Sequence, residues 1–175
     1  MGDNRVEVAL QQQENYRFLA QYEGDTPDLI TDEPAPLGGN QGPSPAQLLV
    51  TALGNCLSDS LVFALGKFHQ PNDGIRTEAV GHLGRNADNH LRVVGVDVTL
   101  HLGHPAAQFQ RLERILDQFE QFCTVSQSVV TALPIQPKVL DSEGSPDRPW
   151  GWVHSDWSAR PCWRCRPALR PAPYR

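Results

Sequence analysis

The sequence predicts an α+β domain in which antiparallel sheets surround one long buried helix. Segments with strand-type alternation precede an apolar helical segment, two more alternating segments follow it, and amphipathic helical segments come next. Because strands and helices do not alternate one by one, the pattern is not that of a parallel βαβ fold. With 175 residues, of which 39% are hydrophobic, the chain is long enough to form one domain with its own core.

The N-terminal region is predicted to form strands. Residues 5–10, RVEVAL, and residues 16–22, YRFLAQY, alternate apolar and polar positions, which is typical of half-buried strands joined by a turn. Residues 28–31, DLIT, are the candidate for a third short strand. The next segment, DEPAPLGGNQGPSP at 32–45, is rich in proline and glycine and is predicted to be a loop.

A long helix is predicted from Ser44 to about Phe68. Ser44 can cap the helix, Pro45 fits its first position, and Gln47 can complete a capping box. Apolar residues lie on nearly all sides of this segment, which is typical of a buried helix. Pro71 ends the helical pattern.

The second half of the body is predicted to form a hairpin, two helices and a closing strand. The strands of the hairpin are expected at 74–84 and 90–103, around the polar turn RNADN. A helix is predicted at about 105–122, and its apolar face can pack against a sheet. That face holds Phe109, Leu112, Ile115, Leu116, Phe119 and Phe122. A short helix from 124, ended by Pro134, and a strand at 134–140 complete the order β-β-α-β-β-α-α-β.

The charge divides the chain into a body and a tail. Residues 1–141 hold 9 Lys and Arg against 17 Asp and Glu, whereas residues 142–175 hold 6 Arg against 3 acidic residues. An acidic body argues against nucleic acid as the main partner. The tail contains all four Trp and is rich in Pro and Arg, without a regular period, so we expect a disordered appendage to the domain at 1–141. A fusion scar would have the same composition.

We expect no membrane span and no export signal. No apolar run reaches the roughly 18 residues of a spanning helix, and the N-terminus lacks the basic-then-apolar order of a signal peptide. The expected location is the cytoplasm, where thiols stay reduced. Four cysteines in such a chain suggest chemistry or metal binding before a structural disulfide framework.

Cys56 and Cys123 are the candidate reactive residues of the body. A cysteine within an apolar helix is more often a small core residue than a catalyst, so Cys56 alone does not indicate chemistry. Cys123 stands between two predicted helices, where unpaired N–H groups favour a thiolate. If the two sulfurs meet, one thiol can be oxidised to a sulfenic acid and the other can condense with it.

Two motifs carry a resemblance to a known family. GPSPAQLLVTALGNC at 42–56 and FCTVSQSV at 122–129, with LGG upstream, are similar to motifs of the OsmC/Ohr family of thiol-dependent organic hydroperoxide reductases. The resemblance covers residues 1–141 and implies an intertwined homodimer with the cysteine helices at its core. It implies that Cys56 is the peroxidatic and Cys123 the resolving cysteine. It further implies organic or fatty-acid hydroperoxides as substrates, no bound cofactor, and an external dithiol such as a lipoylated protein as reductant.

The sequence departs from the pattern of these peroxidases near the start of the cysteine helix. The family carries a glutamate there, which orients an arginine beside the reactive sulfur. This chain has Ala46 and Gln47 at the candidate positions, and Arg17 lies inside a predicted strand. Two hypotheses therefore stand: a two-cysteine hydroperoxide reductase, or a dimeric protein of this fold without peroxidase activity that binds apolar ligands or acts as a scaffold.

Other polar groups are weaker candidates. CWRC at 162–165 has the spacing of a metal or redox site, but a closed zinc site needs four ligands and only His154 lies near. His101 and His104 are interpreted as polar residues at a strand end. Asp59 is interpreted as a hydrogen-bonding residue one turn beyond the cysteine of the long helix. We predict no metal site, and a metal or nucleic-acid function of the tail is the third hypothesis.

Overall fold

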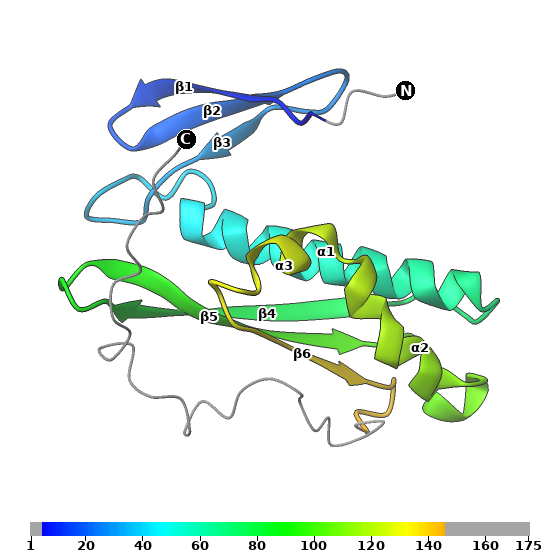
Figure 1. Ribbon diagram of the computed structural model, residues 1–175. Helices are drawn as coiled ribbons and strands as arrows, with labels where there is room; N and C mark the ends of the chain where they lie inside the picture. Colours follow the sequence, from blue (N-terminus) through cyan, green and yellow to red (C-terminus); the bar gives the residue numbers. More distant parts are fainter. Residues whose placement is uncertain (1–4, 146–175) are drawn as a thin grey trace, which may run out of the picture.

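The computed structural model describes residues 5–145, which form two three-stranded sheets with a helical layer between them (Figure 1). The first sheet holds β1 (Val8–Glu14), β2 (Arg17–Tyr22) and β3 (Leu29–Thr31), all antiparallel. The predicted strands are present, although the first begins later and runs further than its alternation indicated. Every residue of β1 is exposed, so this sheet has one strand without any cover in the single chain.

The second sheet contains β4 (Arg76–Arg85), β5 (Leu91–His101) and β6 (Ile135–Leu140). β4 and β5 form the predicted antiparallel hairpin. The expectation of antiparallel sheets only is wrong for β6, which pairs with β5 in parallel. The reason is the connection: helices lie between the two strands and carry the chain back to the starting end of β5, as a parallel pair requires.

The helix α1 (Pro45–Lys67) lies along the second sheet, as predicted for the long apolar segment (Figure 1). By length and composition alone it could cross a membrane, contrary to the expectation that no segment would. The core helix of a soluble protein passes the same test, and part of α1 is packed in the core. Its buried residues include Leu53, Leu57, Leu61 and Leu65.

The second predicted helix is broken into parts. A 3₁₀ turn at Ala106–Gln108, the helix α2 (Leu112–Phe119) and a 3₁₀ turn η2 (Glu120–Phe122) replace the single helix expected at about 105–122. Arg111 has a φ of 56°, in the left-handed region, so the backbone cannot run through it as an α-helix. The apolar periodicity of the segment correctly predicted α2. It does not predict the left-handed residue that precedes this helix.

One hydrophobic core joins α1, α2 and the inner face of the second sheet. The strand β5 contributes alternate residues, because its side chains point in turn to the two faces of the sheet. The residues of this core that are less than 2% exposed include Leu53, Leu57, Leu61, Leu65, Val96, Val98, Leu100, Ile115, Leu116, Phe119, Cys123 and Val139.

A single chain covers only part of the apolar surface of α1, and the expected burial of this helix at a dimer core stays a prediction. Phe63 is 56% exposed and Val62 is 37% exposed. Phe122, which the apolar periodicity places on the buried face of the second helix, is 41% exposed and stacks edge-on against Phe63. Apolar periodicity therefore identified surfaces that need cover, and the single chain covers only part of them.

The last described element is the short helix α3 (Thr124–Val129), which leads to β6. It is shorter than predicted, because turns rather than helix connect it to Pro134. The residues from 146 onward, with CWRC at 162–165, lie outside the described residues. The division into a domain at 1–141 and a disordered tail stays a prediction.

Candidate functional site

The start of α1 is fixed by the capping box that the sequence predicts. The Ser44 side chain accepts a hydrogen bond from the N–H of Gln47 at 3.3 Å, and the Gln47 side chain accepts one from the N–H of Ser44 at 2.8 Å. Pro45 occupies the first helical position, where a missing N–H costs nothing. The predicted capping role of Gln47 is confirmed, and the capping box fixes where α1 begins.

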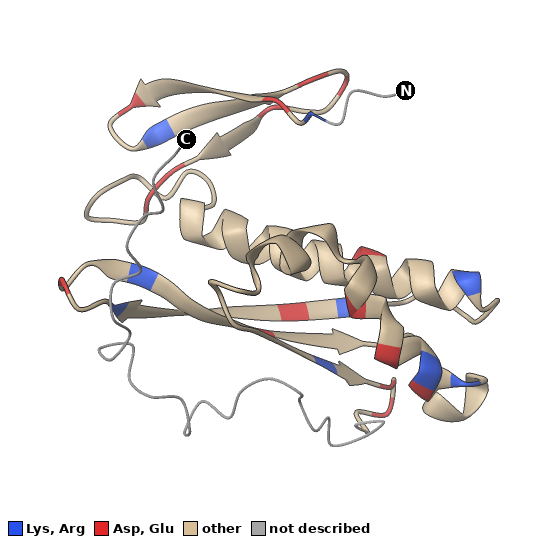
Figure 2. Cartoon of the chain, viewed as in Figure 1, with Lys and Arg blue, Asp and Glu red and all other residues tan. Residues whose placement is uncertain are grey.

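Cys56 lies in the middle of α1 and is half-buried. Its neighbours Leu53 and Leu57 are buried in the core. Within α1 only Asp59 and Lys67 carry charge, and the helix is otherwise uncharged along its length (Figure 2). The thiol therefore sits at the border of the core, in a helix that brings no cation close to it.

Cys123 is the N-cap residue of α3. Its backbone is extended, and its sulfur accepts a hydrogen bond from the N–H of Ser126 at 3.4 Å. The residue is fully buried. The prediction that Cys123 stands at the start of a helix is confirmed, and the sulfur occupies the place where serine or threonine oxygens commonly cap helices.

The two sulfurs converge on the first turn of α3. The N–H of Val125 donates to the Cys56 sulfur at 3.4 Å, and the N–H of Ser126, one residue on, donates to the Cys123 sulfur. These N–H groups have no acceptor within the helix, because the first turn of any α-helix leaves its donors unpaired. Both thiols are free. Two cysteines 67 residues apart in sequence are thus held beside each other by consecutive peptide groups.

The environment of Cys56 favours the neutral thiol. Burial raises the pKa of Cys56, and the neighbouring Cys123 thiol, through a hydrogen bond and its charge, raises it further. The N–H groups of Val125 and Ser126 act in the opposite direction but do not outweigh burial. Within residues 5–145, the hydrogen bond to the Cys56 sulfur from a peptide group comes from Val125, and no arginine takes that place.

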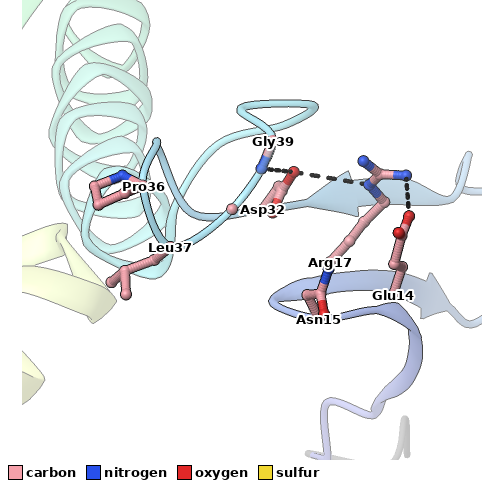
Figure 3. Close-up of a pocket in the computed structure, with 8 residues that line it drawn as sticks. Glu14, Asn15, Arg17, Asp32, Pro36, Leu37 and Gly39 are labelled. Atoms are coloured by element: carbon pink, nitrogen blue, oxygen red, sulfur yellow. Dashed lines mark hydrogen bonds and ion pairs between the residues drawn. The ribbon is translucent and has the colours of Figure 1, made fainter.

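Arg17 lies elsewhere, in a cleft beside the first sheet (Figure 3). Its guanidinium is 3.6 Å from the Glu14 carboxylate and 3.7 Å from the Asp32 carboxylate. The cleft, of about 270 Å³, is also lined by the loop before α1. The described contacts of Arg17 are with these two carboxylates and not with Cys56, so the single chain does not join the arginine to the thiols.

Asp32 is a residue whose importance the sequence did not reveal. Its side chain is 1% exposed and accepts hydrogen bonds from the N–H groups of Glu33, Gly39 and Gln41, at 2.9, 3.0 and 3.1 Å. The carboxylate therefore closes the loop that leads into α1. A Cβ at Gly38 would collide with the Glu33 carbonyl oxygen and with Asp32 itself, so this loop needs glycine there. An aspartate directly before a proline- and glycine-rich loop is the available sequence signal.

The weaker sequence candidates make local contacts. Asp59 accepts a hydrogen bond from Asn55, one turn earlier on α1. His104 bonds to Asp73 at 2.9 Å, and the nearest carboxylate of His101 is that of Glu78, at 3.9 Å. Among residues 5–145 there is no group of three or more His, Cys, Asp or Glu side chains placed to hold a metal ion.

The chain matches a family model described as OsmC-like protein over residues 38–138. This range includes the last part of the loop before α1, and it includes Cys56 and Cys123. A search of the curated proteins gives no significant match.

Several solved structures have the same fold. An OsmC-like protein of unknown function from Vibrio cholerae has a TM-score of 0.66 at 16% identity, covering 79% of this chain and 100% of the other. An organic hydroperoxide resistance protein OsmC from Legionella pneumophila has a TM-score of 0.63 at 13% identity, covering 79% and 98%. The organic hydroperoxide resistance protein OhrB of Bacillus subtilis has a TM-score of 0.57 at 13% identity, covering 77% and 97%.

Proposed function

The chain belongs to the OsmC-like protein family, and we propose that it reduces organic hydroperoxides with Cys56 and Cys123. The observation that carries the proposal is the convergence of the two sulfurs on neighbouring N–H groups of α3. Two proteins with this fold are described as organic hydroperoxide resistance proteins, which supports the same class of substrate. Cys56 is the thiol that a hydroperoxide can reach, because it is half-buried whereas Cys123 has no exposed surface.

The proposed reaction has three balanced steps. The Cys56 thiolate attacks the terminal oxygen of ROOH, the O–O bond breaks, and the leaving oxygen takes a proton to give the alcohol ROH and a sulfenic acid on Cys56. The Cys123 thiol then displaces water from that sulfenic acid, and a Cys56–Cys123 disulfide forms. An external dithiol, such as a lipoylated protein, reduces the disulfide by exchange and is itself oxidised to a disulfide. The site residues need no bound cofactor, and we propose that the cycle runs in the cytoplasm.

We also propose that the active form is a homodimer. The support is the apolar surface that one chain leaves uncovered. Leu10 on β1 is 65% exposed and lies on the same face of the first sheet as Val8, and α1 exposes Val62 and Phe63. A contiguous apolar patch left exposed on a sheet face is typical of a surface that binds a partner. A second copy of the chain would cover both surfaces at once.

A second candidate function is a dimeric OsmC-like protein without peroxidase activity, which binds apolar ligands or acts as a scaffold. The observation that favours it is the raised pKa of Cys56, caused first by burial, together with the engagement of Arg17 by Glu14 and Asp32. A neutral thiol is a poor nucleophile. The two functions differ in one property, which is the reactivity of the Cys56 thiol near pH 7.

Turnover of cumene hydroperoxide by the full chain, with dithiothreitol as the external dithiol, tests the proposal. We expect consumption of hydroperoxide that is lost on Cys56→Ser. In the Cys123→Ser variant, one equivalent of hydroperoxide should still react when dithiothreitol is left out, because Cys56 is intact. Asn55→Ser is a matched control, because it changes a polar residue of α1 one position from Cys56. No turnover by the unaltered protein, or full turnover by Cys56→Ser, would exclude the peroxidase and leave the second candidate.

A further inference from the structure

The peptide N–H of Val125 has an unusual acceptor. Val125 is the second residue of α3, where the backbone donor has no partner within the helix. The N–H of Ser126 donates to the Cys123 sulfur, and the N–H of Gln127 bonds to the Cys123 carbonyl oxygen at 3.0 Å. The N–H of Val125 instead reaches across to α1 and donates to the Cys56 sulfur at 3.4 Å. An N–H group held in this way is fixed by the backbone, so it needs no rearrangement when charge appears on the sulfur.

The surroundings of Cys56 offer few alternatives to this donor. The N–H of Ser126 also lowers the pKa of Cys56, but its own hydrogen bond goes to the Cys123 sulfur. The titratable groups of α1, α2 and η2 near this region are Asp59, Lys67, Glu113, Arg114, Asp117 and Glu120, together with the Cys123 thiol. The two cations have other contacts, because Lys67 lies over the Phe122 ring and Arg114 over the Phe68 ring. Residues of α3 carry no charge. The second sheet meets α1 with uncharged side chains, as shown by the contacts of Gly54 and Ser58 of α1. These sheet residues are Thr77 and Ala79. The helix α2 also buries only apolar side chains, which are Leu112, Ile115, Leu116 and Phe119.

We infer that the N–H group of Val125 is the donor that stabilises the anionic sulfur of Cys56, in the role that a charged side chain would otherwise fill. The inference rests on the proposed function, because it concerns the thiolate that attacks the hydroperoxide. A peptide donor suits a half-buried site, since it stabilises the anion without bringing a second charge out of water. It also links the two cysteines, because the backbone segment that follows Cys123 lowers the pKa of the Cys56 thiol through this N–H.

The test removes this one N–H and leaves the side-chain chemistry intact. Val125→Pro lacks the backbone donor, and proline is tolerated in the first turn of a helix because that N–H makes no helical bond. Two matched controls separate the donor from other effects. Thr124→Pro removes the neighbouring first-turn N–H, which donates to neither sulfur, and Val125→Ala shortens the side chain but keeps the N–H.

The readout is the rate at which iodoacetamide labels Cys56 in the reduced full-length chain, followed by peptide mass spectrometry from pH 6 to pH 10. We expect Val125→Pro to raise the midpoint of the pH profile by about one unit, which is about tenfold slower labelling at pH 7. Thr124→Pro and Val125→Ala should stay within about twofold of the unaltered protein. Equal profiles for Val125→Pro and Thr124→Pro would overturn the inference.

A backbone ester at position 125, made by semisynthesis, provides a second variant if Val125→Pro does not fold. The ester replaces the N–H by oxygen and retains the valine side chain. The same upward shift is expected, and an unshifted profile would overturn the inference. Because iodoacetamide labelling requires no hydroperoxide, this result is independent of the turnover experiment. An unshifted profile in a protein that still turns over hydroperoxide would reject the role of Val125 and leave the proposed reaction standing.

Discussion

The N–H of Ser126 donates to the sulfur of Cys123 at 3.4 Å, so a cysteine serves as the N-cap residue of α3. The same thiol is the proposed resolving group. One sulfur therefore has a structural and a chemical role, and substitutions of different kinds should separate the two.

Replacement of Cys123 by serine and by alanine should have different effects on stability. A serine oxygen can accept the same bond from Ser126, whereas alanine leaves that buried N–H without a partner. We expect the free energy of unfolding of Cys123→Ala to be about 1 kcal/mol lower than that of Cys123→Ser. Urea denaturation of the two variants at pH 7, in the presence of a reductant, measures the difference. Equal stabilities would show that the cap contributes nothing.

The chemical role of Cys123 predicts over-oxidation of Cys56 when the second thiol is absent. After excess cumene hydroperoxide, Cys56 of Cys123→Ser should carry a sulfinic acid, because no thiol removes the sulfenic acid. The unaltered protein should instead contain the Cys56–Cys123 disulfide. Peptide mass spectrometry distinguishes the two products, and a disulfide from Cys56 to another cysteine in the unaltered protein would contradict the assignment of Cys123.

The loop closed by Asp32 should make stability depend on acid pH. Burial alone would raise the pKa of Asp32, but the N–H groups of Gln41, Gly39 and Glu33, with Arg17, outweigh it and hold the pKa below its ordinary value of 3.8. A lowered pKa in the folded state means that the carboxylate stabilises the fold above pH 3.8 and loses this effect as the pH falls through the lower folded value.

Asp32→Asn should remove this contribution. The variant should be less stable than the unaltered protein at pH 7, and the difference should narrow as the pH falls below 3.8. Urea midpoints measured from pH 7 to pH 2.5 test this expectation. Glu33→Gln is the matched control, because Glu33 is the neighbouring acid and offers its N–H rather than its carboxylate to the loop. A constant difference between Asp32→Asn and the unaltered protein across this range would contradict the prediction.

The capping box predicts that a glutamate at position 47 stabilises the protein. The first turn of α1 has no acidic residue. Gln47→Glu retains the bond to the Ser44 N–H and places a negative charge near the positive end of the helix, which should raise the free energy of unfolding by about 0.3–1 kcal/mol. Gln47→Ala, which loses the bond, should lower it. Urea denaturation at pH 7 measures both, and a destabilising Gln47→Glu would contradict the electrostatic argument.

The proposed dimer should depend on the first sheet. Leu10→Asp places a charge on its exposed apolar face, and we expect it to convert the dimer to a monomer in size-exclusion chromatography with light scattering. Val80→Asp is the control, because Val80 is 56% exposed on β4, on the face of the second sheet that turns away from α1. Loss of the dimer in both variants, or in neither, would contradict the proposed interface.

The sequence predicted most elements of this fold but not all their boundaries or directions. The helix α1 was predictable because its cap residues are neighbours in the chain, and the β4–β5 hairpin because its alternation is regular. The direction of β6 and the break at Arg111 were not, since apolar periodicity reports which side of a segment is buried and not how the segment is connected. In the site, the resemblance named Cys56 and Cys123, whereas Asp32 and the N–H of Val125 carried no comparable signal.

The sequence by itself determined the family, the order of most elements, the start of α1 and the position of Cys123 at the start of a helix. These features depend on residues close together in the chain or on motifs with fixed spacing. Only the tertiary structure decided which groups surround each sulfur, which carboxylates hold Arg17, and which apolar surfaces one chain leaves open. Those features depend on contacts between distant segments, and a backbone N–H, which every residue except proline has, becomes specific only when the fold places it against its acceptor.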